Sequence, residues 1–599
     1  MTLTAALENP FNLFSPLFAQ RALLAVLLLA LIAAAVGWAI ILRDLPFFTH
    51  AVGTGAYPVL VLGILAGVSI AVSALIGTLV FALLLGLAAG IGRTRASGTS
   101  AGRRDALTGL AVAAALALGA VLAARAGSEN ARLAISPEAL LFGSLLTIDT
   151  ATLTVLAIVT VLVLTTAWFA SDRWLAGGFD PGVAGHLASS RSDIALLGCV
   201  AIGAGASLPV TGSLLAGALL IIPAATARML TDRARHLPPL VFAIAVVEGV
   251  LGLYLSLNFD LPTGAAIAAV AGAGFFAAAG VVAVRLARGP LRPAVSMAVV
   301  ALGAVALAGC GSSSSTSNSD GEALRVVATT PQVADIVKQV GGESVSVTTL
   351  LPAGADPHDF EPKPKAVAAI ADAGVVFRSG GDLDAWLLPA VKAANAKSAP
   401  VDLSRSAVLL PAGGTGESFN AHWYLAPENV ARATQRVRDE LVKADPDARE
   451  TFRTNATQYL DKIDAANRSL SACASKVPDG DRSVMTGHND FAYLAEAFDF
   501  KVAAQIASNG ESEPSASELQ KSVDRARAAD VRALIASRGE VTKLEQEVAD
   551  KLGVPMLALY ADNLTGGDDA STLLGAIGYD VDRIVDAVTD GAVKCPATQ

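Results

Sequence analysis

The residues best suited to hold a metal ion are the histidines, and few are present. Three lie in the C-terminal half, each in a loop-like context after a predicted strand: His358 in GADPHDFEPKP, His422 in FNAHWYLAPENV and His488 in SVMTGHNDFAYL. Neutral imidazole together with carboxylate suits a borderline ion such as zinc, which takes four tetrahedral ligands. No histidine pair has His-x-x-x-His spacing, so a site would have to be assembled from distant segments. Spacing alone leaves open the ordinary interpretation of surface or core histidines.

Composition divides the chain into two unlike parts. Of its 599 residues 53% are hydrophobic, a value typical of a membrane protein, yet no lysine occurs before Lys338. Charged residues are concentrated in the C-terminal part, which has the composition of an ordinary soluble domain. The net charge of −9 gives no indication of nucleic-acid binding. A chain of this length is expected to hold at least two domains.

Residues 1–292 are predicted to form a polytopic all-α membrane domain with eight or nine transmembrane helices, each needing about 20 apolar residues. The expected spans lie near 20–42, 57–74, 76–92, 106–126, 149–170, 193–208, 211–229, 239–258 and 263–284, of which the second and third are short. Arginine clusters mark cytoplasmic loops by the positive-inside rule. They lie at 93–104, 173–191, 228–235 and 285–292, with two spans between neighbouring clusters.

Residues 293–322 have the layout of a signal or anchor segment followed by a linker. Arginines precede the apolar segment 294–309, and Leu307-Ala308-Gly309-Cys310 resembles a bacterial lipobox, in which the cysteine is lipidated. The following GSSSSTSNSDG is a flexible tether. The alternative is one more membrane span with an incidental cysteine. The order of signal, cysteine and linker favours the lipobox, and both interpretations place the following domain outside the cytoplasm.

Residues 323–599 are predicted to form an α/β two-lobed domain. LRVVATT, VSVTTLLP, VRALIAS and VPMLALY have the pattern of short buried strands, with helical periodicity in the neighbouring segments. Residues 428–476 are charged, lack glycine and are interrupted only by Pro446, which predicts one long helix or a broken pair. The lobes are therefore expected at about 323–427 and 480–599, linked by this helix.

The remaining cysteines have different expectations. Cys199 lies in an apolar stretch and is most simply a small core residue. Cys473 and Cys595 lie in the outer part, where a disulfide between them is plausible in an oxidising compartment. Sequence does not establish whether the two approach each other, so pairing stays one of two outcomes.

The segment 324–599 resembles the bacterial solute-binding proteins that capture zinc, manganese or iron for ABC-type importers. The motifs that carry the resemblance are VVATTPQVADIVKQVGGESVSVTTLLPAGADPHDFEPKP, GGDLDAWL, HWYLAPENV, TGHNDFAYLAEAFDF, SEPSASEL and LYADNLTGG. Carried over by position, the resemblance implies His358 and His422 as ligands from the first lobe, and His488 and Asp562 from the second.

The third of these ligands bears on the metal. In the family a histidine there accompanies zinc and a carboxylate accompanies manganese or iron, so His488 implies Zn²⁺ as the transported ligand, with Mn²⁺ or Fe²⁺ as the alternative. Two departures weigh against the match: PAGGTGESFN lacks the His-rich loop of many zinc-specific relatives, and Asn420-Ala421-His422 stands where Asp-Pro-His is commoner.

Residues 17–284 resemble the membrane permease of the same importers. The motifs are RDLPFFTHAVGTG, LLFGSLLTI, FDPGVAGHL, GSLLAGALLIIPAATARML and SLNFDLPTG. His50, Asp149 and Glu248 are candidate members of a permeation path, because ionisable groups at membrane depth are costly. The ordinary alternatives are that Asp149 caps a helix at the outer interface and that Glu248 pairs with another side chain.

Together these features predict a transporter component and not an enzyme. No GxxxxGK[ST] phosphate loop occurs in the sequence, so ATP hydrolysis is expected from a separate ABC ATPase subunit that contacts loop 171–192. The resemblance implies a permease homodimer in the bacterial plasma membrane. One alternative of another class is a metal-sequestering or adhesive surface lipoprotein with an inactive permease half.

Overall fold

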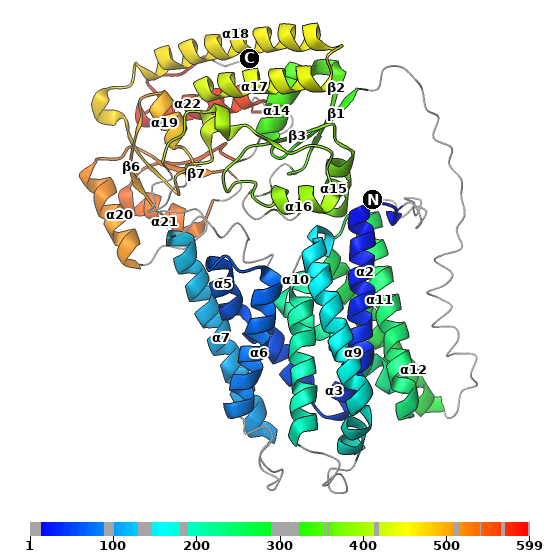
Figure 1. Cartoon of the computed structure of the whole chain (residues 1–599). Helices are drawn as coiled ribbons and strands as arrows, with labels where there is room; N and C mark the ends of the chain where they lie inside the picture. The colour runs from blue at the N-terminus through cyan, green and yellow to red at the C-terminus, as the bar shows by residue number, and fades with distance from the viewer. Residues whose placement is uncertain are drawn as a thin grey trace.

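The computed structural model of the chain shows a bundle of long helices next to a two-lobed α/β domain (Figure 1). It describes residues 13–88, 101–129, 145–179, 190–288, 323–352, 355, 357, 360, 362–411, 419–506, 516–538, 541–562, 564 and 570–596. His358, Cys310 and the segment 294–309, each the subject of a prediction above, lie outside these residues.

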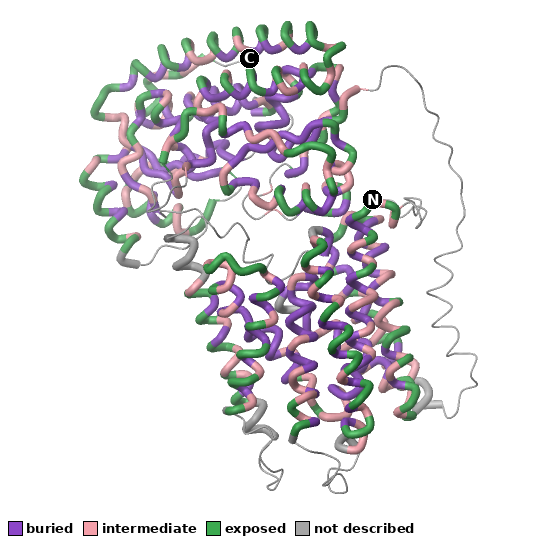
Figure 2. The backbone as a smooth tube through the Cα atoms, viewed as in Figure 1, coloured by how far each residue is buried: buried purple, intermediate pink, exposed green. Residues whose placement is uncertain are grey.

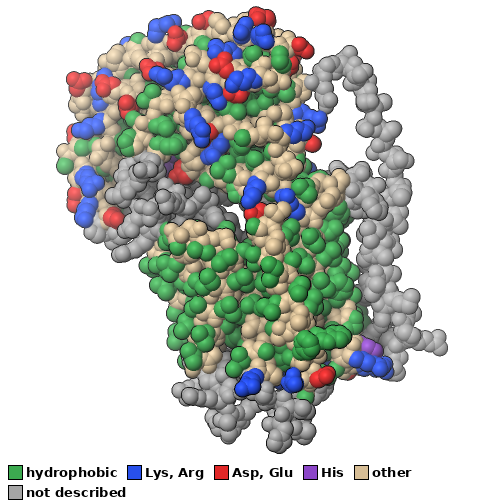
Figure 3. Space-filling view, in the orientation of Figure 1, with side chains coloured by type: hydrophobic (Ala, Val, Ile, Leu, Met, Phe, Trp, Pro, Cys, Tyr) green, Lys and Arg blue, Asp and Glu red, His purple; other side chains and the backbone are tan. Residues whose placement is uncertain are grey.

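The helical part is made of strongly apolar segments. Its helices are α2 (Leu17–Ile32), α3 (Trp38–Leu42), α4 (Pro46–Gly55), α5 (Tyr57–Leu65), α6 (Ile70–Ala88), α7 (Ala101–Glu129), α9 (Thr150–Phe179), α10 (Ser190–Leu230), α11 (Leu237–Phe259) and α12 (Thr263–Arg288). Within the described residues, seven helices are long and apolar enough to cross a membrane, and Ala106–Leu122 and Ala216–Leu230 are shorter apolar helices. Large apolar side chains cover the flank of the bundle (Figure 3), including Trp168 at 82% exposure. Such a surface is suited to lipid.

The predicted boundary between the second and third spans is wrong. The apolar pattern predicts spans at 57–74 and 76–92, whereas α4 and α5 run from Pro46 to Leu65 and α6 begins at Ile70. The chain turns at Gly67, whose φ of 74° is readily adopted only by glycine. Its neighbours are apolar, so hydropathy alone does not reveal this turn. His50 consequently lies within α4 and not in a loop.

Helix α10 is a hairpin of two arms, as the two predicted spans at 193–208 and 211–229 require. Gly212 has φ 73° and ψ 168°, which breaks the helix. Ser207 Oγ donates a hydrogen bond to the Ala216 carbonyl at 3.5 Å, so residues on either side of the break lie together. The helix α12 ends at the side of the bundle that lies away from the α/β domain (Figure 1). The α/β domain begins with strand β1 (Leu324–Ala328).

Each lobe of the α/β domain contains a four-stranded parallel sheet. The first has the order β2-β1-β3-β4 and the second β6-β5-β7-β8. The remaining strands are β2 (Val345–Thr349), β3 (Val375–Arg378), β4 (Val401–Asp402), β5 (Ser483–Thr486), β6 (Lys501–Gln505), β7 (Leu534–Ser537) and β8 (Met556–Leu559). The four strand motifs recognised in the sequence form β1, β2, β7 and β8. The strands are largely buried within the domain (Figure 2), as parallel sheets covered by helices on both faces require.

The helices of this domain cover the two sheets and join the lobes. They are α14 (Pro331–Gly341), α15 (Pro364–Asp372), α16 (Leu387–Ala394), α17 (Pro427–Ala444), α18 (Arg449–Ala474), α19 (Ala492–Ala497), α20 (Ala516–Ala528), α21 (Lys543–Leu552) and α22 (Leu573–Val588). Of the two predictions for 428–476, the broken pair is correct: α17 and α18 are separate helices on either side of Pro446. Proline lacks the amide donor that a continuous helix needs.

The first lobe contacts the end of the helical bundle through α15 and α16. Lys392 Nζ forms an ion pair with Asp149 Oδ2 at 2.7 Å. The Lys365 amide donates to Asp260 Oδ1 at 3.1 Å, and the Arg21 guanidinium donates to the carbonyl of Ala393 at 3.5 Å. A single buried apolar cluster continues from α15 and α16 into the helical part.

Candidate metal centre

The structure brings together three of the four predicted ligands. His422, His488 and Asp562 each offer a ligand atom, and these atoms lie within 4.8 Å of one another. His422 precedes a 3₁₀ turn in the first lobe, whereas His488 follows β5 and Asp562 follows β8 in the second. Loops at the carboxyl ends of parallel strands are the usual place for ligand sites in such sheets. This is the one such group of three or more among the described residues.

A neighbouring amide orients His422. Asn420 Oδ1 accepts hydrogen bonds from the His422 backbone N–H and ring Nδ1, both at 2.9 Å. With Nδ1 as the donor, the tautomer leaves the Nε2 lone pair for a metal, and Nε2 faces Asp562 Oδ1 at 3.1 Å. His422 is only 5% exposed, so its ring is fixed by packing as well as by this bond.

Asp562 is held by side chains from both lobes. The Tyr424 hydroxyl donates to Oδ1 at 3.1 Å, and Ser537 Oγ donates to Oδ2 at 3.5 Å. Gln332 of α14 donates to the adjacent Ala561 carbonyl at 3.0 Å. A buried carboxylate in contact with an imidazole nitrogen is the donor set of a zinc-type or related transition-metal site.

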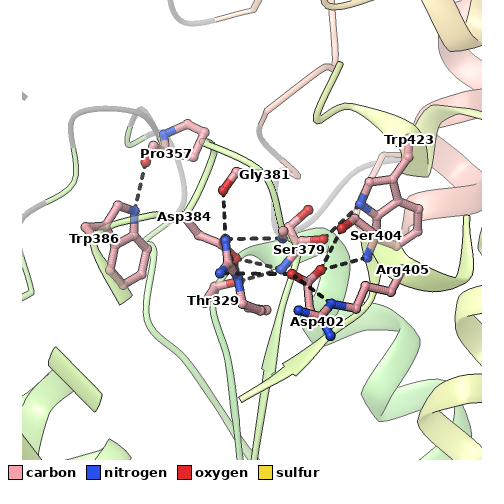
Figure 4. Close-up of polar contacts among 12 residues, drawn as sticks. Thr329, Pro357, Ser379, Gly381, Asp384, Trp386, Asp402, Ser404, Arg405 and Trp423 are labelled. Carbon is pink, nitrogen blue, oxygen red and sulfur yellow. Dashed lines mark hydrogen bonds and ion pairs between the residues drawn. The ribbon is translucent and has the colours of Figure 1, made fainter. Parts of the chain in front are cut away.

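A buried polar network around Asp384 fixes the loops of the first lobe (Figure 4). Asp384 is fully buried, and it pairs with Arg378 at 2.8 Å while accepting from Thr329 Oγ1 and the Ser379 amide. The Ser379 carbonyl in turn accepts from the indole N–H of Trp423, the residue after His422, at 3.0 Å. The GGDLDAWL motif therefore supports the loop that carries this ligand.

The same motif reaches the first ligand loop. The Trp386 indole donates to the Pro357 carbonyl at 2.9 Å (Figure 4). The aromatic rings of Trp386 and Phe360 meet edge to face, with centroids 4.8 Å apart. His358, the predicted ligand of this loop, lies outside the described residues, so its role stays a prediction.

Two residues of the site were not assigned a role from the sequence. Asn420 was noted only as a departure from the family motif. Asp490 is completely buried beside the site, with Oδ2 at 3.7 Å from His488 Nε2. Burial raises the pKa of Asp490 well above its ordinary value, and the negative charge of Asp562 adds to the effect.

Two of the three candidate permeation residues, Asp149 and Glu248, have different surroundings. Asp149 Oδ1 accepts from the Thr152 amide at 2.8 Å and so caps α9, as the ordinary alternative predicts. Burial raises the pKa of Asp149, but hydrogen bonds from Lys392 and Thr152 outweigh this effect and lower it to about 2. Glu248 is 5% exposed and lines a cavity of about 30 Å³ together with Thr211.

The two cysteines of the α/β domain are paired. Cys473 at the end of α18 and Cys595 near the C-terminus form a disulfide, with Cα atoms 5.5 Å apart. Cys199 is a free, buried cysteine, as expected for a small core residue. The disulfide ties the linking helices to the second lobe and suits an oxidising compartment.

Comparison with known proteins assigns both parts. Residues 16–283 match the ABC 3 transport family, and residues 326–587 match ZnuA, the periplasmic zinc-uptake complex component A. The manganese-binding lipoprotein MntA of Halalkalibacterium halodurans is 26% identical over 49% of this chain and 97% of that protein. The zinc-binding lipoprotein AdcA of Streptococcus pneumoniae is 29% identical over 38% of this chain and 46% of that protein.

Solved structures are also similar to part of this chain. The periplasmic zinc-binding protein TroA from Treponema pallidum is 20% identical, with a TM-score of 0.41, over 45% of this chain and 99% of that one. The Mn-bound periplasmic metal-binding protein from Candidatus Liberibacter asiaticus is 21% identical, with a TM-score of 0.41, over 45% of this chain and 100% of that one. From the two family matches, this chain joins a permease of the ABC 3 transport family to a ZnuA-like metal-binding solute-binding domain in one polypeptide.

Proposed function

We propose that this metal importer component takes up zinc, capturing the ion in the outer domain and delivering it to the permease of the same chain. The observation that carries the proposal is the convergence of His422, His488 and Asp562 from two lobes on one buried point. Imidazole nitrogen with one carboxylate favours zinc, whereas manganese prefers more oxygen ligands. His358 is the proposed fourth ligand.

The main alternative is a manganese or iron importer of the same architecture. Relatives of both kinds resemble the outer domain: MntA and the streptococcal ScaA and PsaA proteins are named for manganese, and AdcA is named for zinc. Identity at this level does not choose between them, so the donor set is the better guide. A sequestering lipoprotein with an inactive permease half would bind metal but would not import it.

Delivery is supported by the contact between the first lobe and the bundle. The Lys392 ammonium pairs with Asp149 at the start of α9, and the Lys365 backbone amide donates to Asp260 at the end of α11. Asp149 therefore acts in this proposal as a helix cap and docking residue. His50 and the cavity-lining Glu248 remain the proposed groups along the path through the bundle.

The match with the ABC 3 transport family supports a proposal for the rest of the importer. We propose that a separate ABC ATPase binds the segment 171–192, which includes the end of α9 and the start of α10, on the cytoplasmic side, and that two permease copies assemble in the plasma membrane. Cys310 is the proposed lipid anchor. Joining the capture domain to the permease, by fusion or by a shared membrane anchor, raises its effective concentration at the docking surface.

The test is a competitive titration of Zn²⁺ against Mn²⁺ on the full chain in detergent. The parent should bind one ion per outer domain and prefer zinc, and His488→Ala should weaken zinc binding by at least about 10-fold. His236→Ala is the matched control, because His236 is exposed in a short 3₁₀ turn of the helical part. A preference for manganese, or zinc binding indifferent to His488, would refute the assignment.

Uptake needs its own measurement. Cells that express the chain with its ATPase should accumulate radioactive zinc, and a variant lacking the metal site should not. Binding without accumulation would favour the sequestering alternative.

A further inference from the structure

Three buried carboxyl groups lie in or near the capture site, and their surroundings differ. Asp562 is in the ligand group and receives hydrogen bonds from Tyr424 and Ser537. Asp580 accepts from the Tyr560 amide at 3.0 Å and lies close enough to Arg538 to feel its positive charge. Asp490 is the third, and no cationic lysine or arginine is recorded beside it among the described residues.

Asp490 points into the site with one oxygen unsatisfied. Its Oδ1 accepts from the amide of the next residue, Phe491, at 3.1 Å. Its Oδ2 is buried without a hydrogen-bond partner among the described residues, and its nearest recorded polar neighbour is His488 Nε2 at 3.7 Å. The contact with Phe491 uses one oxygen and does not account for the second. Buried polar atoms nearly always have a partner, so this oxygen needs an explanation, and a bound ion is one.

The charge of the ion explains the arrangement. A divalent cation held by neutral imidazoles and Asp562 alone would leave one uncompensated positive charge in a buried site, which is costly. A further oxygen beside His488 reduces this cost. We propose that Asp490 is a specificity-determining residue of the capture site, which supplies an additional oxygen near the bound ion. The inference rests on the proposed capture of a divalent metal by His422, His488 and Asp562.

The additional oxygen has a consequence for metal choice. Zinc is satisfied by four ligands that include nitrogen, whereas manganese depends more on carboxylate oxygen. Asp490 therefore raises the affinity for manganese, while the histidines maintain the preference for zinc. Removing the carboxylate should reduce the affinity for both ions and should reduce that for manganese more.

The experiment compares Asp490→Asn and Asp490→Ala with the parent, using the full chain in detergent and titrating Zn²⁺ and Mn²⁺ separately against a competing chelator. We expect a loss of about 10- to 100-fold for manganese and a smaller loss for zinc. Asp580→Asn is the matched control, since Asp580 is equally buried and also has an oxygen without a hydrogen-bond partner among the described residues, but it has no recorded contact with a ligand histidine. It should change the two affinities by similar factors.

The outcomes separate this inference from the proposed function. Affinities of Asp490→Asn within about twofold of the parent would overturn the role of Asp490 and leave the capture site intact. Equal losses for both metals would also overturn it, because loosening of the fold has that effect and a specificity role does not. If His488→Ala retains full zinc binding in the same titration, the capture site itself is misassigned.

Discussion

Asn420 offers the sharpest test of how this site is built. Asn420→Ala removes the acceptor that holds both the backbone N–H and the ring Nδ1 of His422. It also removes the donor to the Asn489 carbonyl, next to His488. The loop itself should keep its course, because the Asn420 backbone still accepts from the Tyr493 hydroxyl at 2.9 Å and donates to Leu410 at 2.9 Å.

The expected magnitude follows from these contacts. Loss of the partner that orients a ligating histidine weakens metal binding by about 10- to 100-fold, or about 1.4–2.7 kcal/mol. The three lost hydrogen bonds contribute about 0.5–1.5 kcal/mol each to folding, so the metal-free protein should also be less stable. Asn420→Asp retains the acceptor and adds a negative charge beside the ring, which strengthens the imidazole as a ligand. Its zinc affinity should stay much closer to that of the parent.

The assay is chelator competition for zinc on the full chain, with thermal unfolding of the metal-free protein measured in parallel. Asn429→Ala is the matched control, because Asn429 is also buried and holds the same loop through Val408 and the Trp423 carbonyl without touching His422. It should lose stability and keep zinc affinity within a few-fold. If Asn420→Ala binds zinc as tightly as the parent, or if both variants lose affinity equally, Asn420 does not orient the ligand.

The other predictions concern the disulfide, the buried ion pair of the first lobe and the ion pair between the first lobe and the helical bundle. Replacing Cys473 and Cys595 with serine should destabilise the outer domain by about 2–5 kcal/mol, and a reducing agent should lower the unfolding temperature of the parent but not of this variant. Asp384→Ala removes the closest partner of the buried Arg378, leaves it only a 4.0 Å ion pair with Asp402, and should cost about 3–5 kcal/mol, measured by denaturant unfolding. Asp382→Ala, at an exposed position in the same motif, should have little effect. Lys392→Ala and Asp149→Ser test the ion pair between the two parts, and serine at position 149 retains an oxygen that can cap the helix. In a double-mutant cycle on uptake the two substitutions should show a coupling energy of about 0.2–1 kcal/mol. That coupling energy should decrease at high salt. Strictly additive effects would argue that this ion pair does not contribute to docking.

Much of the architecture was accessible from the sequence because local patterns determine it. Short apolar runs rich in valine, such as LRVVATT, can hardly form anything but buried strands, and Pro446 interrupts a helix wherever it falls. The α5–α6 turn was misplaced because glycine and serine in an apolar stretch are compatible with a membrane helix. Only the backbone angle of Gly67 distinguishes the turn from a continuous span.

The site was accessible in part. Its histidines and Asp562 come from segments far apart in sequence, so spacing could not join them, and the family resemblance supplied the grouping. The role of Asn420 could be predicted from the local sequence. An asparagine side chain often accepts a hydrogen bond from the backbone N–H two residues later, as Asn420 does from His422. No local sequence signal predicts the role of Asp490, since an acidic residue before an apolar helical segment is ordinarily interpreted as a cap.

The division of the ligands between lobes connects capture with release. His422 belongs to the lobe whose helices α15 and α16 contact the bundle, whereas His488 and Asp562 belong to the other lobe. Polar contacts tie the lobes across the site, among them Gln332 to the Ala561 carbonyl and Asp335 to the Leu573 amide. Movement of the second lobe alone would therefore separate the ligands while the docking contacts of the first lobe stay in place. A site built within one lobe could not release its ion in this way, because its ligands would move together.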